Sequence, residues 1–251
     1  PHAFLSEANN VTIRDLVVEK YATPAQSGAI QSGDFDNGVV GSGWVIEDSE
    51  VRLNHGAGIR SGELTVLRRV SVHSNGQLGI AFSGGSGGLI EDCEIANNNI
   101  AGFDWGWEAG GAKFTVTTGL VVRGTWSHDN NGPGLWTDIS NYDTLYEGNL
   151  VVDNTGPGIF HEISYAAVIR DNAVTGNGHG SSEWLWGSGI LVAASTDVEI
   201  YDNTVTGNAD GIGGIQQARE EGPEGPYLLA NLFVHDNTLS VERGPIGVGE
   251  D

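Results

Sequence analysis

A short phrase recurs nine times along the 251 residues and constrains the fold more than any other feature of the chain. Its clearest copies, Ile169–Asn177 and Ile200–Asn208, read apolar-x-Asp-Asn-x-apolar-x-x-Asn. The third residues of successive copies lie 33, 21, 23, 32, 24, 23, 31 and 34 residues apart. We take the 21 to 24 residue spacings as the base unit and the longer ones as that unit plus a loop. A unit this short cannot bury a core alone, so the repeat predicts a solenoid of stacked units. The nine third residues are Asp15, Asp48, Arg69, Asp92, Gly124, Gly148, Asp171, Asp202 and Asp236.

A second phrase, glycine followed by a large apolar residue, follows most copies of the first. Each unit therefore contains two or three short strands joined by turns, and 39 glycines in the chain suit many tight turns. This pattern predicts an all-β fold, a right-handed parallel β-helix of about nine rungs, with the handedness taken from the general rule for parallel crossovers. The recurring turn asparagines should stack into amide ladders. The second phrase occurs at Gly58-Ile59, Gly79-Ile80, Gly102-Phe103, Gly134-Leu135, Gly158-Ile159, Gly189-Ile190 and Gly211-Ile212.

These Asn-x-[Val/Ile]-x-x-Asn and Gly-[Ile/Leu] rungs resemble those of the pectate-lyase-like superfamily of secreted bacterial right-handed parallel β-helix proteins. The resemblance covers nearly the whole chain. It implies a secreted or extracellular protein whose partner is a polysaccharide or oligosaccharide. That superfamily contains polysaccharide lyases, glycoside hydrolases, epimerases, esterases and non-catalytic adhesins, so it does not choose an activity. We expect residues 1–251 to form a single domain, in which either the caps that a solenoid needs lie outside the sequence or the termini are unusually short.

Charge and composition exclude several classes of function. Eleven Lys and Arg against 33 Asp and Glu give a net charge of −22, which repels phosphate backbones and anionic lipids. We therefore expect no nucleic-acid partner and no membrane partner. The sequence contains no run of 18 apolar residues, so it predicts no membrane-spanning segment. Cys93 is the single cysteine, so neither an intrachain disulfide nor a cysteine zinc site is available. The oligomeric state is left open.

Stacking the glycine-apolar strands predicts which side chains share an outward column, because side chains alternate between the two faces of a strand. Asp138 and Glu162 then fall on neighbouring rungs, roughly 5 Å apart. Carboxyls this close cannot both ionise freely, so one pKa should be raised, as in the acid–base pair of a glycosidase. The alternatives are a shared Ca²⁺ or two idle solvated carboxylates. The predicted first column is Arg60, Ala81, Asp104, Trp136, Phe160, Leu191 and Gly213, and the second is Gly62, Ser83, Gly106, Asp138, Glu162, Ala193 and Ile215.

Three stretches, 104–113, 134–138 and 158–165, concentrate Trp, His, Lys, Glu and Tyr where other rungs hold Val, Thr, Asn and Gly. Such local departures tend to mark functional sites. Lys113 either neutralises charge on the substrate or pairs with Glu108 across a turn. His161 falls on an inward position, where a hydrogen-bonded core histidine is the alternative to a catalyst. The candidate catalytic residues are Asp138, Glu162, Asp104, Glu108, Lys113 and His161.

Aromatic side chains around the same rungs are candidates for sugar stacking, since exposed indoles are costly without a ligand. Two of them lie on the loop Gly178–Gly187, where ordinary loop packing is the alternative. A turn-capping phenol is the alternative for Tyr165. The candidate substrate-binding residues are Trp136, Trp107, Phe160, Arg60, Trp184, Trp186 and Tyr165.

The sequence thus predicts a carbohydrate-active enzyme that cleaves a polysaccharide in a groove along the parallel sheet, by hydrolysis with paired carboxylates. One alternative is a calcium-dependent lyase; the resemblance implies an Arg or Lys base, for which Arg60 and Lys113 are the candidates. Another is a non-catalytic carbohydrate-binding β-helix. The charge favours a neutral or weakly charged glycan, or a polyuronate bridged by Ca²⁺, which is the one metal considered. Asp34, Asp36 and Asn37 have the spacing of a weak Ca²⁺ loop, for which a solvated turn is the alternative.

Overall fold

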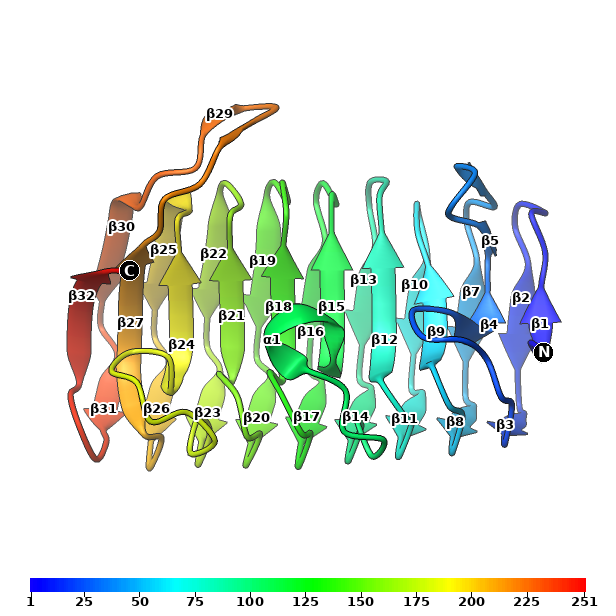
Figure 1. Ribbon diagram of the computed structural model, residues 1–251, viewed down its shortest axis with the longest axis horizontal. Helices are drawn as coiled ribbons and strands as arrows, with labels where there is room; N and C mark the ends of the chain where they lie inside the picture. The colour runs from blue at the N-terminus through cyan, green and yellow to red at the C-terminus, as the bar shows by residue number, and fades with distance from the viewer.

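Three parallel sheets run the length of the molecule in a computed structural model that describes residues 1–251. We call them sheets A, B and C (Figure 1). Each coil of the chain contributes one strand to each sheet in turn, which gives nine complete coils and a tenth strand in sheet A. The prediction of a right-handed parallel β-helix with about nine rungs is confirmed.

The strands of each sheet follow one another in chain order, and each is hydrogen-bonded to the next. Sheet A contains β1 (Phe4–Leu5), β4 (Gly28–Gln31), β9 (Ala57–Ser61), β12 (Leu78–Ser83), β15 (Gly110–Thr115), β18 (Leu135–Asp138), β21 (Ile159–Glu162), β24 (Ser188–Ala193), β27 (Asp210–Gln216) and β32 (Ile246–Glu250). Sheet B contains β2 (Thr12–Arg14), β7 (Val45–Glu47), β10 (Val66–Arg68), β13 (Leu89–Glu91), β16 (Val121–Arg123), β19 (Thr144–Glu147), β22 (Ala167–Arg170), β25 (Thr196–Tyr201) and β30 (Ala230–His235). Sheet C contains β3 (Val17–Glu19), β8 (Glu50–Arg52), β11 (Ser71–His73), β14 (Glu94–Ala96), β17 (Trp126–His128), β20 (Leu150–Val152), β23 (Ala173–Thr175), β26 (Thr204–Thr206) and β31 (Thr238–Ser240).

Insertions between strands give the coil its few other elements. Helix α1 (Trp105–Glu108) and the loop 178–187 both precede a sheet A strand, and in Figure 1 both lie in front of that sheet. A hairpin of β28 (Glu221–Gly222) and β29 (Gly225–Pro226) leaves the end of β27 and projects beyond the coil. A second hairpin, β5 (Gly33–Asp34) with β6 (Val39–Val40), follows β4. None of the helices has the length and apolar character that crossing a membrane requires.

The bend from sheet B to sheet C explains the first repeated phrase. All nine of its third residues adopt a positive φ, between 49° and 63°. Asp and Gly tolerate this left-handed conformation better than most residues, which accounts for their recurrence there. The asparagine that follows Asp in the later copies stacks on its counterparts, as Asn149, Asn172, Asn203 and Asn237 do through amide hydrogen bonds of 2.9 Å. The predicted amide ladder is confirmed at this bend.

A longer ladder at the bend from sheet C to sheet A explains the second phrase. Asn54, Asn75, Asn98, Asn130, Asn154, Asn177 and Asn208 are joined by side-chain amide bonds of 2.8–3.0 Å. A Cβ atom at Gly158 would lie 3.0 Å from Asn177 Nδ2, and one at Gly189 would lie 2.6 Å from Asn208 Nδ2. The glycine of the Gly-Ile phrase therefore makes room for the asparagine ladder, and the two phrases describe one packing arrangement.

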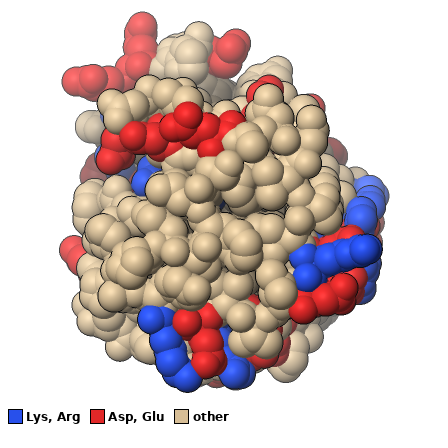
Figure 2. All heavy atoms as spheres, turned by 90° about the vertical axis from the view of Figure 1, so that its right-hand side faces the viewer, with Lys and Arg blue, Asp and Glu red and all other residues tan.

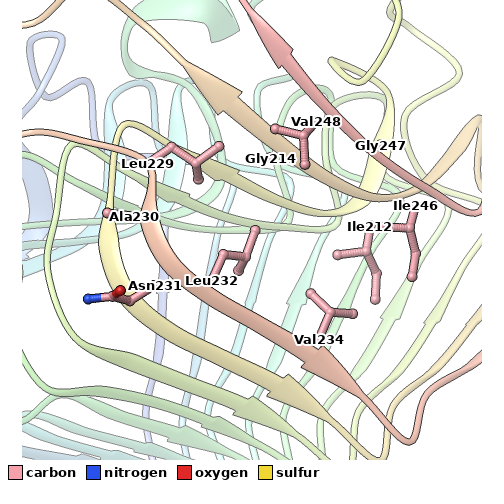
Figure 3. Close-up of a pocket in the computed structure, with 10 residues that line it drawn as sticks. All are labelled: Ile212, Gly214, Leu229, Ala230, Asn231, Leu232, Val234, Ile246, Gly247 and Val248. Carbon is pink, nitrogen blue, oxygen red and sulfur yellow. The ribbon is translucent and has the colours of Figure 1, made fainter.

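The core is a single column of apolar side chains inside the coil. It comprises 33 buried residues, with one inward aliphatic or aromatic side chain from nearly every strand. The interior is open at the C-terminal end, where inward-facing Ile246 and Val248 line a recess of about 410 Å³ with Leu232 and Val234 (Figure 3). This recess continues the core and holds no ionisable side chain. The face at the opposite end of the coil is mostly uncharged, with acidic and basic side chains gathered together at its rim (Figure 2).

Candidate active site

The register of sheet A places most predicted outward residues as expected and corrects one rung. The first outward column is Gln31, Arg60, Ala81, Lys113, Trp136, Phe160, Leu191, Gly213 and Gly247. Lys113 stands where Asp104 was predicted, and Thr115 where Gly106 was predicted. The Gly102-Phe103 pair was wrongly taken as the strand. The insertion that lengthens this unit comes before the strand, and β15 begins only at Gly110.

Asp138 and Glu162 are neighbours across two rungs of sheet A, as predicted. Trp136 pairs with Phe160 and Thr137 with His161, so the next residues, both outward, lie side by side. Adjacent parallel strands are about 4.8 Å apart. Both residues are buried, with 7% and 6% of their surface exposed. The predicted open groove is therefore not seen at this point: Lys113 contacts Asp138, and Arg219, from the segment after β27, contacts Glu162.

Lys113 anchors one half of the pair. Its Nζ lies 2.8 Å from Asp138 Oδ2 and 3.0 Å from Glu108 Oε2, and it donates a 2.7 Å hydrogen bond to the Trp107 carbonyl. It also sits 3.8 Å from the centre of the Trp136 ring, a cation–π contact. The predicted pairing of Lys113 with Glu108 is present, but the same ammonium also fixes one oxygen of Asp138. Helix α1 supplies Glu108 and the Trp107 carbonyl, which explains why it lies over this rung.

Glu162 has a different environment. Burial and, after it, the charge of Asp138 raise the pKa of Glu162 to about 7, against the opposing effects of Arg219, Lys113 and the Trp136 indole. Arg219 Nη2 donates a 2.8 Å hydrogen bond to Glu162 Oε1. The expectation that one carboxyl of the pair has a raised pKa is confirmed, although burial contributes more than the neighbouring charge. Near neutral pH this carboxyl can hold or release a proton.

Two buried polar atoms at the site have no partner. Asp138 Oδ1 and Trp136 Nε1 are both shielded from solvent and make no hydrogen bond, and the whole chain contains only two other such side-chain atoms. The Trp136 N–H nevertheless lies near Glu162, since it lowers the pKa of that carboxyl. Buried polar atoms are normally satisfied, and exceptions in native proteins call for an explanation. A bound ligand that hydrogen-bonds Asp138 Oδ1 would supply one, whereas the Trp136 N–H already acts on the Glu162 carboxyl as a hydrogen-bond donor.

The aromatic residues divide into buried and exposed sets. Trp136 and Phe160 stack with ring centres 5.4 Å apart and are 3% and 4% exposed, so neither forms the open sugar platform that the sequence predicted. Trp186 meets Phe160 edge-on at 6.1 Å. Trp107 and Trp184 are 61% and 57% exposed and remain available to a ligand.

Two other predicted residues have structural roles. His161 is fully buried inside the coil, where Nδ1 lies 2.7 Å from Thr137 Oγ1 and Nε2 lies 2.6 Å from the Tyr165 carbonyl. Burial lowers the pKa of His161 to about 4, so the ring is neutral and fits the alternative of a hydrogen-bonded core histidine. Tyr165 donates its hydroxyl to the Gly225 carbonyl at 2.9 Å and is 3% exposed. It holds the hairpin down and is not open to substrate.

Arg60 and Asp104 lie outside the acid pair. Arg60 is two rungs from Lys113 in the same column, donates to the Gln26 carbonyl and stacks on Phe35 at 4.4 Å. Asp104 is the N-cap of α1 and accepts from the Gly106 amide at 2.9 Å. Both are occupied by local contacts that stabilise loops.

The sequence reasoning missed Arg219. This residue lies in the insertion 217–229, which the alignment of columns does not cover. Gln217 Oε1 accepts hydrogen bonds from Arg219 Nε at 3.1 Å and Nη2 at 3.0 Å, which aims the guanidinium at Glu162. The one available signal was the position of the insertion, directly after a sheet A strand. Contacts of Tyr227 with Ser140 and of Tyr165 with Gly225 bring the hairpin back over earlier rungs.

Backbone strain accumulates beside the acid pair. Val116, Ile139 and Ile163 follow the outward residues Thr115, Asp138 and Glu162, and their φ angles are 57°, 63° and 35°. A β-branched residue with positive φ is a steric outlier and costs roughly 1–3 kcal/mol. Three consecutive outliers of this kind occur at no other bend of the coil. Strain of this type clusters at functional sites.

No group of three His, Cys, Asp or Glu side chains is placed to hold a metal ion. The predicted loop at Asp34 is a capped turn: its carboxylate accepts from the Asp36 amide, the Asn37 amide and the Asn37 side chain. The arrangement at Asp138 and Glu162 instead offers a fixed carboxylate beside a carboxyl that titrates near pH 7. Such a pair can transfer a proton and attack an electron-poor carbon.

Solved structures share this fold at low sequence identity. XylC in complex with xylose is 14% identical with a TM-score of 0.66, over 96% of this chain and 52% of that one. The periplasmic alginate epimerase AlgG is 15% identical with a TM-score of 0.60, over 99% of this chain and 62% of that one. An alginate lyase from Paenibacillus sp. str. FPU-7 is 18% identical with a TM-score of 0.55, over 94% of this chain and 87% of that one. The chain thus spans between half and two thirds of the length of the first two proteins.

The solved structures show a similar fold, and a family profile shows to which family the chain belongs. No curated protein sequence matches the chain. The profile described as "Right handed beta helix region" matches residues 37–205, which is more than half of the sequence and contains both carboxylates of the pair. The three-sheet coil and its asparagine ladders agree with that match. The chain therefore belongs to the right-handed β-helix family.

Proposed function

We propose that this protein is a glycoside hydrolase that acts outside the cell on a polysaccharide bound against sheet A, with Asp138 and Glu162 as its catalytic pair. The observation that carries the proposal is that two adjacent buried carboxyls have unlike environments. Lys113 neutralises the first at 2.8 Å, and burial raises the pKa of the second to about 7. An acid with a raised pKa beside a carboxyl that is paired with a cation is the arrangement that glycosidic bond cleavage requires.

Each carboxyl has a definite role in the proposed reaction. Glu162 donates its proton to the glycosidic oxygen as the bond from that oxygen to the anomeric carbon breaks. Asp138 Oδ1, which has no partner in the protein, forms a bond to the same carbon, while Lys113 holds Oδ2. A water then attacks the anomeric carbon, Glu162 takes the water's proton, and Asp138 leaves as the carboxylate. The rung spacing of about 4.8 Å suits this double displacement, because retaining enzymes hold their carboxyls about 5–5.5 Å apart.

Substrate reaches the pair by displacing Arg219. The side chain of Arg219 is 39% exposed, whereas that of Glu162 is 8% exposed, so the arginine is the movable member of the ion pair. Once the arginine leaves, Glu162 loses a charge that favours its ionised form. Displacement of Arg219 therefore both opens the site and favours the protonated acid.

The lyase alternative has less support. A lyase base needs a free amine or guanidinium lone pair aimed at a sugar C5 proton. Lys113 is 3% exposed, with its Nζ occupied by three oxygen acceptors and the Trp136 ring. Arg60 lies three rungs from the rung of Asp138, about 14 Å by strand spacing. A lyase that uses Ca²⁺ would also need a set of ligands, and the chain assembles no group of three acidic side chains.

The deciding experiment incubates the protein with a panel of neutral and acidic polysaccharides and follows both reducing ends and ultraviolet absorbance, with and without a chelator. Hydrolysis produces reducing ends without the absorbance of an unsaturated uronide and is unaffected by the chelator. Absorbance that depends on calcium would establish the lyase instead. Binding of a glycan without cleavage, unchanged in Asp138→Asn and Glu162→Gln, would establish a non-catalytic binding protein.

A further inference from the structure

A second feature of the outer face of sheet A is a recess near its C-terminal end, apart from the acid pair. It has a volume of about 220 Å³, and its lining includes Trp184, Leu185, Trp186, Ile215 and Gly249. The acidic residues Glu183, Glu250 and Asp251 complete its lining, and no Lys or Arg does. Apolar walls with a few polar groups at the rim are typical of small-molecule sites.

The loop 178–187 is built to hold its indoles in this place. Buried Asp210 accepts the Leu185 amide at 3.0 Å and the guanidinium of Arg243 at 2.7 Å, and Arg243 also donates to the Ser182 carbonyl at 3.0 Å. Trp184 lies against the outer face of β32, where a Cβ on Gly247 would come within 2.8 Å of its ring. Gly247 and Gly249 have no side chains, so the indole can pack directly against the backbone of this strand. Trp184 is nevertheless 57% exposed, and such exposure of a rigidly held indole is costly without a ligand.

The recess is in line with the acid pair. Glu162, Ala193, Ile215 and Gly249 occupy successive positions of one outward column, which places the recess three rungs, roughly 14 Å, beyond Glu162. Trp186 connects the two places, because it lines the recess and also meets Phe160, which stacks on Trp136. Leu191 and Ala193, the outward residues between the two places, are 0% exposed, so a chain molecule that reaches both places lies over the side chains that cover them.

We infer that this recess is a distal subsite for an uncharged sugar unit of the polysaccharide, with Trp184 as the stacking surface. A pyranose presents an apolar face to the indole and hydroxyl groups to the surrounding carboxylates, which only accept hydrogen bonds. A uronate in the same place would bring a fourth negative charge among three, with no cation to compensate. The inference rests on the proposed function for the identity of the polymer, but binding at the recess does not require cleavage.

The experiment measures binding to Glu162→Gln by calorimetry, so that cleavage does not interfere. The probes are the neutral hexamers of xylose, glucose, mannose and galactose and the acidic hexamers of mannuronate, guluronate and galacturonate. We expect at least one neutral hexamer to bind, and Trp184→Ala in the same background to weaken that binding roughly ten-fold or more. Trp126→Ala is the matched control, since this indole is 43% exposed but lies on sheet C. Its affinity should equal that of the parent.

The outcomes separate this inference from the proposed function. If no neutral hexamer binds, if acidic hexamers bind more tightly, or if Trp184→Ala retains full affinity, the distal subsite is refuted whatever the wild-type protein does to a polysaccharide. If Trp184→Ala loses affinity and the wild-type protein cleaves nothing, the subsite stands and the hydrolase proposal fails. Thermal unfolding of Trp184→Ala should match that of the parent, because the side chain is mostly in solvent.

Discussion

The outer faces of sheets A and B use charged residues in opposite ways. On sheet B, successive rungs carry Arg14, Glu47, Arg68, Glu91, Arg123, Glu147 and Arg170 in one column, so that each of the five charges between the two ends has opposite charges above and below it. Glu91 is paired on both sides, at 2.7 Å to Arg68 and 2.5 Å to Arg123. On sheet A, two acids are neighbours and both are buried.

The difference shows which charged columns are informative about function. Alternating exposed charges cost little and stabilise little, since solvent screens them. Two adjacent buried carboxyls oppose folding, and a chain that retains them has a use for them. The effects on pKa agree: Arg68 and Arg123 lower the pKa of Glu91, whereas burial raises that of Glu162 to about 7.

The largest expected effect is on catalysis. Asp138→Asn should reduce turnover of the cleaved polysaccharide about 1,000-fold or more, because the nucleophile is lost while the shape of the site is kept. Glu91→Gln, the matched change on sheet B, should leave turnover within about two-fold. Initial rates under saturating substrate measure both. Equal losses of turnover in the two variants would contradict the prediction that the acids of sheet A, and not those of sheet B, are catalytic.

The next effect concerns stability. Lys113→Met keeps an apolar side chain over Trp136 but leaves Asp138 and Glu108 without their buried cation, so we expect a loss of about 3 kcal/mol or more in the free energy of unfolding. Arg68→Met removes a cation whose side chain is 35% exposed and should change stability little. Denaturant titrations at neutral pH compare the two. If Lys113→Met left the free energy of unfolding unchanged, the ion pairs of Lys113 with Asp138 and Glu108 would not stabilise the fold.

A third effect depends on pH and has opposite signs on the two sheets. The pKa of Glu162 is raised in the folded state, so its contribution to stability is present below its ordinary pKa of 4.5 and is lost as the pH rises to about 7. Relative to Glu162→Gln, the wild-type protein should lose roughly 3 kcal/mol of stability between these values. The pKa of Glu91 is lowered, so its contribution is present above 4.5 and lost as the pH falls. Parallel titrations of Glu162→Gln and Glu91→Gln should diverge in opposite directions.

The smallest effect tests Arg219. This cation lowers the pKa of Glu162 in the free enzyme, so Arg219→Gln should move the alkaline limb of the kcat/KM profile to higher pH, since the acid then keeps its proton longer. Arg219→Lys should move the limb less than Arg219→Gln does, because lysine keeps the positive charge. Arg243→Gln is a control for loop disruption, because it frees the loop 178–187 without touching Glu162. A limb that does not move in Arg219→Gln would remove this residue from the proposed mechanism.

Much of the architecture could be predicted from the sequence because the turns of each rung are determined by residues close together in the sequence. The left-handed Asp or Gly at one bend and the Gly–Asn packing at another recur at regular spacing, and each can be recognised as a repeated phrase in the sequence. The adjacency of Asp138 and Glu162 followed from the same spacing. The misplacement of Asp104 shows the limit: a repeat fixes the strands but does not say on which side of a strand an insertion lies.

The sequence by itself determined the coil, its period and the pairing of the two acids, because stacked parallel strands convert sequence spacing directly into spatial neighbours. Only the tertiary structure decided how those acids differ. Helix α1, which covers Lys113, and the segment that carries Arg219 are insertions that belong to no repeat, and they create the burial and the ion pairs at the site. A pKa depends on every charge and dipole within a few ångströms, and such neighbours are set by where loops fold back in space.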